Sequence, residues 1–98
     1  MTYDEILSSI DNHLFQSTKR FYKDFYIGIT DDIENCLFGS HNVDRNSDWW
    51  IYCPANSEEI AKRIRTYFLD KGMAGNSTDE KQGSNCVYCY EITNKSRQ

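Results

Sequence analysis

The chain has 98 residues, a length that suits one domain with a thin hydrophobic core and excludes an enzyme with separate cofactor and substrate domains. Its 15 acidic and 11 basic residues give a net charge of −4, which argues against nucleic-acid binding by bulk electrostatics, because neutralising phosphates needs a basic surface. The sequence shows no apolar run of roughly 18 residues and no signal-peptide layout at its start, so we expect a cytoplasmic protein without a membrane partner.

The first predicted element is an amphipathic helix over residues 2–18. Thr2 is placed to cap this helix, and apolar residues recur at helical spacing from Ile6 to Leu14. His13 falls at the edge of the apolar stripe. We expect the helix to cover one face of a sheet.

A strand is predicted over residues 21–30, because β-forming side chains surround Gly28. Thr30 then has the character of an N-cap for a short helix that ends near Gly39. The polar composition of residues 40–48 is typical of a loop.

A second strand is predicted over residues 49–53, where Pro54 stops it. Side chains alternate between the two faces of a strand, so one of Trp49 and Trp50 must face inward. The sequence leaves open which of the two it is.

The clearest helix follows, capped by Asn56 or Ser57 and ended by Gly72. Its apolar stripe comprises Ile60, Ala61, Ile64, Tyr67 and Phe68. After this helix, the sequence predicts a flexible loop over residues 72–85 and a final strand over residues 86–93. The last residues, 94–98, are predicted to form a frayed tail. The order predicts a single α/β domain over residues 1–98, with a small three-stranded sheet packed with about three helices.

Four cysteines raise the question of a structural metal or a redox site. Cys86 and Cys89 have CxxC spacing, and Cys36 and Cys53 complete the four thiolates that a zinc ion would need. Alternation along a strand would instead send Cys86 and Cys89 to opposite faces. We therefore interpret the four cysteines as small core residues and predict no metal site.

Other chemical signatures point the same way. The sequence contains no Gly-rich loop that would cradle phosphates and no serine in a nucleophile elbow, so we predict no cofactor. Two basic clusters stand out, one comprising Lys19, Arg20 and Lys23 and the other Lys62, Arg63 and Arg65. Such clusters are more often solvated faces than binding patches.

The stretch FYIGIT, residues 25–30, followed by the predicted helix start, resembles the second half of the GIY-YIG nuclease domain. The later strand at 49–53 and the helix at 61–68 lie where that family has its next two elements. The resemblance covers residues 25–71 and implies a GIY-YIG-like fold. In that family, a Tyr positions water, an Arg stabilises phosphate charge and a Glu holds a divalent ion.

The resemblance assigns this chain's residues to those positions with two departures. Tyr26 matches the family's second Tyr, and His41 matches the His after the helix. Cys36 stands where the family has its Arg, and Arg65 stands where it has its Glu. A thiol cannot offer a planar set of donors to a phosphate, and a guanidinium repels a divalent cation. We therefore expect no cleavage.

Three functions are compatible with these features. The first is a module that binds nucleic acid, a nucleotide or a partner, using Tyr22, Tyr26, His41, Trp49, Arg65 and Asn85, with Trp50 and Tyr52 adding aromatic surface. The second is a protein–protein interaction or inhibitor protein of phage or mobile-element origin. The third is a divergent active endonuclease that uses Tyr26, His41 and a carboxylate outside the family position.

Overall fold

A computed structural model describes residues 1–15, 21–31, 49–75 and 85–92. Its elements are helix α1 (Tyr3–Phe15), the 3-10 helix η1 (Tyr22–Asp24), strand β1 (Phe25–Thr30), strand β2 (Trp50–Pro54), helix α2 (Glu58–Asp70), strand β3 (Ala74–Gly75) and strand β4 (Cys86–Glu91). This confirms the predicted α/β class. The predicted helix after Thr30, the loop at 40–48 and the tail at 94–98 lie outside the described residues.

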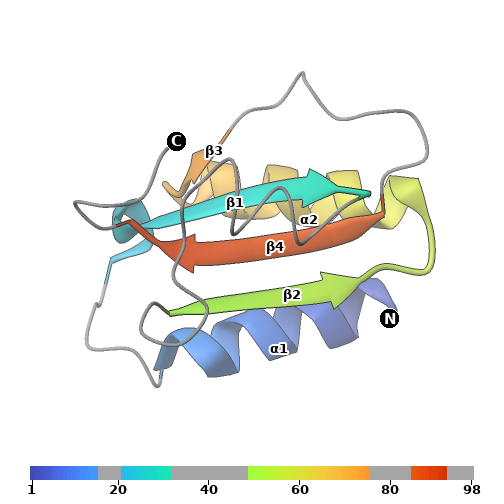
Figure 1. The fold of residues 1–98 in the computed structure, drawn as a ribbon, viewed down its shortest axis with the longest axis horizontal. Coiled ribbons are helices and arrows are strands. Elements are labelled where there is room, and N and C mark those ends of the chain that lie inside the picture. The colour runs from blue at the N-terminus through green and yellow to red at the C-terminus, as the bar shows by residue number, and fades with distance from the viewer. Residues whose placement is uncertain (16–20, 32–48, 76–84, 93–98) are drawn as a thin grey trace.

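The four strands form one mixed sheet in the order β2-β4-β1-β3 (Figure 1). Strand β4 lies between β2 and β1 and is antiparallel to both, whereas β3 pairs in parallel with β1. The final strand in sequence therefore occupies a central place in the sheet, beside the strand that carries Tyr26. The prediction of three strands was wrong by one, because Ala74 and Gly75 fall within the segment predicted as a loop.

Helix α1 begins with a capping box. The Glu5 N–H donates to Thr2 Oγ1 at 3.2 Å, and the Thr2 N–H donates back to Glu5 Oε1 at 2.8 Å. The predicted Thr2 cap is thus confirmed. The helix then buries Ile6 and Ile10 completely or nearly so, which ties its apolar stripe to the core.

The predicted strand at 21–30 begins later than expected. Residues 22–24 form a 3-10 turn, in which the Asp24 N–H donates to the Phe21 carbonyl at 3.0 Å. The Asp24 N–H is thus used in a local turn, and the extended strand starts at Phe25. The remaining six residues of the predicted strand are confirmed.

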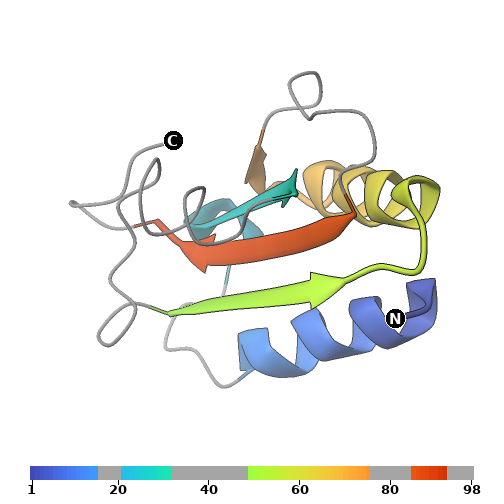
Figure 2. The same ribbon diagram turned by 45° about the vertical axis from the view of Figure 1, so that its right-hand side comes forward.

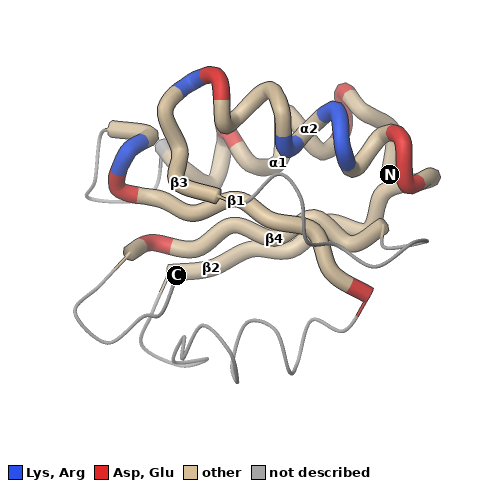
Figure 3. The backbone as a smooth tube through the Cα atoms, turned by 90° about the horizontal axis from the view of Figure 1, so that it is seen from above, with Lys and Arg blue, Asp and Glu red and all other residues tan. Residues whose placement is uncertain are grey.

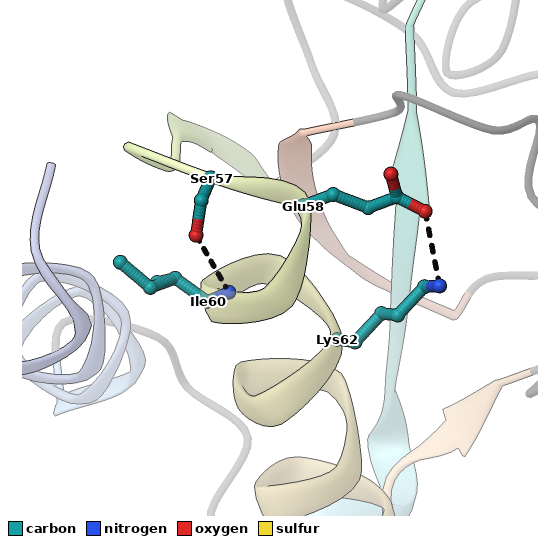
Figure 4. A network of polar contacts seen from close by, with 4 residues as sticks. All are labelled: Ser57, Glu58, Ile60 and Lys62. Carbon is teal, nitrogen blue, oxygen red and sulfur yellow. Dashed lines mark hydrogen bonds and ion pairs between the residues drawn. The ribbon is translucent and has the colours of Figure 1, made fainter.

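Helix α2 has the predicted caps. The Ile60 N–H donates to Ser57 Oγ at 3.2 Å, so Ser57 is the N-cap, and one turn later Lys62 pairs with Glu58 at 2.9 Å (Figure 4). After the helix, Gly72 adopts a φ of 110°, a left-handed conformation that favours glycine. The helix boundaries predicted from the sequence are therefore confirmed at both ends.

Both helices pack on the same side of the sheet (Figures 2 and 3). On that side lies the main core, formed by buried residues of both helices and of the strands; they include Ile6, Ile10, Phe25, Ile27, Cys53, Ile64, Phe68, Val87 and Cys89. Neither described helix is long and apolar enough to cross a membrane. The opposite side of the sheet carries a second, smaller cluster of buried residues, formed by Tyr26, Tyr88 and Tyr90.

Candidate functional site

The sheet face that points away from the helices is aromatic. It carries Tyr26 from β1, Trp50 and Tyr52 from β2, and Tyr88 and Tyr90 from β4, and we call these five side chains the aromatic face. Alternation along each strand explains the set, because the intervening residues, such as Ile27 and Cys89, belong to the core beneath the helices.

Strand register gathers the five side chains into two rows across the sheet. In the first row, Tyr26 is opposite Tyr90, and Tyr90 is opposite Trp50. In the second row, Gly28 is opposite Tyr88, and Tyr88 is opposite Tyr52. Directly opposite side chains on neighbouring strands are in contact range, so each row is a continuous line of aromatic rings apart from the glycine.

In the second row, Gly28 has no side chain. The Tyr88 ring occupies the space that a side chain at Gly28 would fill. A Cβ added at Gly28 would collide with the ring and the hydroxyl of Tyr88. The glycine of the Tyr-Ile-Gly stretch therefore has a packing role in this chain: it lets an aromatic ring lie against the backbone of β1.

The rings of the aromatic face are nearly parallel. Tyr88 and Tyr90 are inclined by 4° with centroids 6.4 Å apart, and Tyr26 lies 5.2 Å from Tyr90 at 20°. Trp50 and Tyr52, two residues apart on β2, are inclined by 9° with centroids 6.1 Å apart. Parallel rings standing on a sheet present flat surfaces to which another planar group can add.

Accessibility differs sharply across this face. Tyr26, Tyr88 and Tyr90 are buried, whereas Tyr52 is 48% exposed and Trp50 is half-buried. Strand β2 is an edge strand of the sheet, which places Tyr52 at the border of the aromatic face. Among the described residues, the other large hydrophobic side chain with such exposure is Phe21, at 64%. The pair Trp50 and Tyr52 is therefore the accessible part of the aromatic face.

The charges of the described chain lie elsewhere. The four strands contain no Lys or Arg and one acidic residue, Glu91. The described Lys and Arg residues belong to α2, its C-cap and η1, and Figure 3 shows the blue segments on the helical side of the sheet. Within the described strands, the aromatic face therefore presents ring π-systems and no charged side chain.

Several residues predicted to form a ligand site are on the helical side. Trp49 packs between His13 and Phe25, with ring centroids 4.5 and 4.9 Å away. Tyr22 packs against Phe68 at 6.1 Å and belongs to the periphery of the main core. The structure therefore separates Trp49 and Tyr22 from Tyr26, which faces the other way.

The remaining predicted site residues are also dispersed. Arg65 is 6% exposed and belongs to the buried stripe of α2, together with Ala61 and Ile64. Asn85 has a structural role: its Nδ2 donates to the Ala55 carbonyl at 3.1 Å, and its own carbonyl accepts from the Ala55 N–H at 2.8 Å. His41 and Cys36 lie outside the described residues.

Tyr88 and Tyr90 were missed as site residues by sequence reasoning. Alternation placed both on one face of the final strand, but nothing in the sequence indicated that this face meets Tyr26 and Trp50. The signal that would have found them is the pairing register of three strands that are distant in sequence.

A carboxyl–phenol pair joins α1 to η1. The Tyr22 hydroxyl donates to Asp11 Oδ1 at 3.5 Å. Burial raises the pKa of Asp11, although the hydrogen bond from Tyr22 and the nearby Lys71 oppose the change. Burial and the neighbouring Asp11 carboxylate raise the pKa of Tyr22. The pair lies on the helical side of the sheet, away from the aromatic face, so we interpret it as a structural contact.

The cysteines do not form a metal centre in the described part of the chain. No group of three or more His, Cys, Asp or Glu side chains there is arranged to hold a metal ion. Cys86 lies on the aromatic side, whereas Cys89 is fully buried on the helical side, where its thiol contacts Met73 Sδ at 3.9 Å. Burial and, to a lesser extent, the nearby Cys53 raise the pKa of Cys89 well above its usual range. Such a thiol is a core group and not a nucleophile.

An open groove lies on the outer side of the helices, lined among others by Tyr3, Lys62, Arg63 and Asp70. The Arg63 guanidinium lies over the Tyr3 ring at 5.1 Å, and Lys62 is paired with Glu58. The two basic side chains of the groove thus already have partners within the chain, which makes it a weaker candidate site than the aromatic face.

The chain matches no protein-family model, and comparisons with curated proteins and with solved structures also found no match. The candidate site therefore stands on the geometry of this chain alone.

Proposed function

We propose that this chain is a non-catalytic binding domain that takes the base of a nucleic acid or nucleotide on its aromatic face, at Trp50 and Tyr52. The observation that carries the proposal is the near-parallel pair of rings on an edge strand, 6.1 Å apart at 9°, with Tyr52 48% exposed. A base has a flat π-face whatever its identity, so it can stack on such rings without a dedicated pocket.

The contribution of stacking to the binding free energy is large enough to measure. Removing an aromatic ring that stacks a base typically costs about 1–3 kcal/mol per base. Tyr90 and Tyr88, which are buried, lie beside the pair on β4 as the direct partners of Trp50 and Tyr52. A preorganised surface loses little side-chain entropy when a ligand binds.

Loss of cleavage is the second part of the proposal, and it rests on the GIY-YIG resemblance. In that alignment, the metal-binding position is occupied by Arg65 and the phosphate-stabilising position by Cys36. Two facts support a non-catalytic assignment. Arg65 is 6% exposed, and Tyr26, the residue at the water-positioning place, is 7% exposed. Both residues are buried, so a substrate has little access to either.

The test is fluorescence-polarisation binding of short single-stranded and duplex DNA and RNA, with magnesium present. We expect single strands to bind better than duplexes, whose bases are already stacked. Tyr52→Ala should weaken binding roughly 5- to 150-fold, the equivalent of about 1–3 kcal/mol. The matched control is Phe21→Ala, which removes an exposed aromatic ring outside the aromatic face. Equal losses in both variants, or a substrate cut during the assay, would contradict the proposal.

One observation favours a second candidate, a protein partner. Strand β2 is an edge strand without a charged residue, and charged residues are a common device by which edge strands avoid pairing with other chains. If no nucleic acid binds at any salt concentration, while Tyr52→Ala changes the association state of the protein, the aromatic face is a protein interface instead.

A further inference from the structure

We infer that the α-amino group of Met1 is a modification site, at which acylation loosens the junction between β2 and α2. Three hydrogen bonds join the main chain of Met1 to Pro54 and Asn56, and they carry this inference. We call these three hydrogen bonds the Met1 clasp. The role of the clasp does not depend on what binds at the aromatic face.

The ammonium of Met1 is held by two acceptors. It donates to the Pro54 carbonyl at 2.8 Å and to Asn56 Oδ1, also at 2.8 Å. In return, the Asn56 N–H donates to the Met1 carbonyl at 2.9 Å. The Met1 side chain is half-buried and packs against the main core. The first residues of a domain are usually poorly ordered unless they are tied down, and these contacts tie Met1 to the fold.

The Met1 clasp holds a place where three strands and helices meet. Ala55, which lies between the two residues bound by Met1, is buried. Ala55 also makes two hydrogen bonds with Asn85, the residue that precedes β4. Ser57, the N-cap of α2, follows Asn56 directly. The clasp therefore fixes the chain where β2 ends and α2 begins.

Acylation of the Met1 nitrogen removes part of the clasp. An ammonium has three N–H donors and a positive charge, whereas an amide has one N–H and no charge. The acylated nitrogen can therefore donate to the Pro54 carbonyl or to Asn56 Oδ1, but not to both. The acyl donor is a thioester. The deprotonated nitrogen bonds to its carbonyl carbon, the carbon–sulfur bond breaks, and the leaving thiolate takes up one proton while another is released to solvent.

Acylation also removes a charge that stabilises the start of α1. The pKa of Glu5 is lowered, chiefly by its hydrogen bonds with Thr2 and to a smaller extent by the Met1 ammonium, while burial opposes the change. Glu5 is the acidic member of the capping box of α1. Hydrogen bonds that involve a charged group are roughly twice as strong as neutral ones, so the bonds of the ammonium are the strong part of the clasp.

The experiment compares the unmodified full chain with a chain acetylated at the Met1 nitrogen alone, as verified by mass spectrometry. We expect acetylation to lower the thermal unfolding midpoint by about 3–8 °C, the shift that loss of one such hydrogen bond produces in a domain of this length. Exchange of the Asn56 amide hydrogen should become roughly fivefold faster, whereas the Ile60 amide, capped by Ser57, should change less. The control for net charge is Lys23→Gln, which removes an exposed positive charge outside the clasp.

Substitutions at Asn56 separate the clasp from a general effect of the acetyl group. Asn56→Ala removes the side-chain acceptor, so acetylation should lower the midpoint less in this variant than in wild type. Asn56→Asp places a carboxylate against the ammonium, so this variant should raise the midpoint more in the unmodified chain than in the acetylated chain.

Three results would overturn the inference. The first is a midpoint and an Asn56 exchange rate that acetylation leaves unchanged. The second is an equal fall of the midpoint in Lys23→Gln, which would assign the effect to net charge. The third is an equal effect of acetylation in wild type and in both Asn56 variants. If the acetylated chain does not fold, Asn56→Ala must still lower the midpoint of the unmodified chain, and a midpoint equal to that of wild type would overturn the inference as well.

Discussion

The ring of Tyr88 lies against the backbone of Gly28, its direct partner on the neighbouring strand, and fills the space where a Cβ would stand. Tyr88 is 4% exposed and stacks with Tyr26 at 6.2 Å, so its ring cannot move aside freely. We predict that Gly28→Ala destabilises the protein by about 1–3 kcal/mol, the usual range for overpacking a well-filled core. Urea denaturation monitored by circular dichroism measures the change.

A double-mutant cycle identifies the contact responsible for this destabilisation. Tyr88→Leu shortens the side chain over the glycine, so Gly28→Ala in that background should cost clearly less than in wild type. Equal costs in the two backgrounds would mean that the Tyr88 ring is not what excludes a side chain at position 28.

The N-cap of α2 yields a prediction about stability. Ser57 Oγ accepts a hydrogen bond from the Ile60 N–H at 3.2 Å, so Ser57→Ala leaves that donor without its cap. We expect a loss of about 1 kcal/mol in the free energy of unfolding, and recovery of most of it in Ser57→Asp, which restores an acceptor. Ser8→Ala, on the exposed face of α1, is the matched control and should change stability little. A loss as large in Ser8→Ala would show that the cap is not the cause.

The Asp11 carboxyl predicts a pH dependence. Its pKa is raised in the folded protein, mainly by burial, so the folded state binds more protons than the unfolded state just above the ordinary value of 3.8. The contribution of Asp11 to stability is therefore fully present below pH 3.8 and is lost as the pH rises through the folded-state pKa.

Asp11→Asn tests this pH dependence. The amide keeps an acceptor for the Tyr22 hydroxyl but cannot ionise, so the variant should gain stability relative to wild type as the pH rises from about 3.5 to 7. The gain should be a few tenths of a kcal/mol, because solvent screens a partly exposed group. Urea midpoints across this range measure it, and the exposed Asp70→Asn variant controls for the change in net charge. A relative gain that shrinks as the pH rises would contradict the assignment.

The cysteines should differ in reactivity. Burial raises the pKa of both Cys53 and Cys89, and Cys89 is fully buried. We expect Cys86, which is half-buried, to react with a maleimide in the folded protein at least tenfold faster than Cys89. Peptide-level mass spectrometry resolves the sites, and urea should equalise the rates. A chelator should leave the unfolding midpoint unchanged, whereas a lower midpoint with EDTA would revive a metal site.

Local patterns were sufficient for the helices but not for the whole sheet. Helix α2 was predictable because Ser57, the apolar stripe and Gly72 all act within the segment itself. Strand β3 was missed because Ala74 and Gly75 carry no strand pattern, and their extended conformation depends on parallel pairing with Tyr26 and Ile27. The turn at η1 was missed because its hydrogen bond competes with a strand that the side chains alone favour.

The candidate site was harder to predict than the elements that build it. Trp50 and Tyr52 were recognised as aromatic surface, but Trp49, their neighbour in sequence, packs against His13 on the other side. Asn85 and Tyr22 looked like polar or aromatic ligands and proved to hold loops and helices together. Which aromatic residues share a face depends on register between distant strands, and no local pattern encodes that register.

The most direct test of the account is to observe Trp50 alone. The Trp49 indole N–H is buried without a hydrogen-bond partner among the described residues, so Trp49→Phe removes the second fluorophore without losing such a bond. In this background we predict that adenosine quenches Trp50 emission saturably, and that adding Tyr52→Ala weakens the effect at least fivefold. Emission that stays unchanged up to saturating adenosine, or quenching indifferent to Tyr52, would contradict a stacking site on the aromatic face.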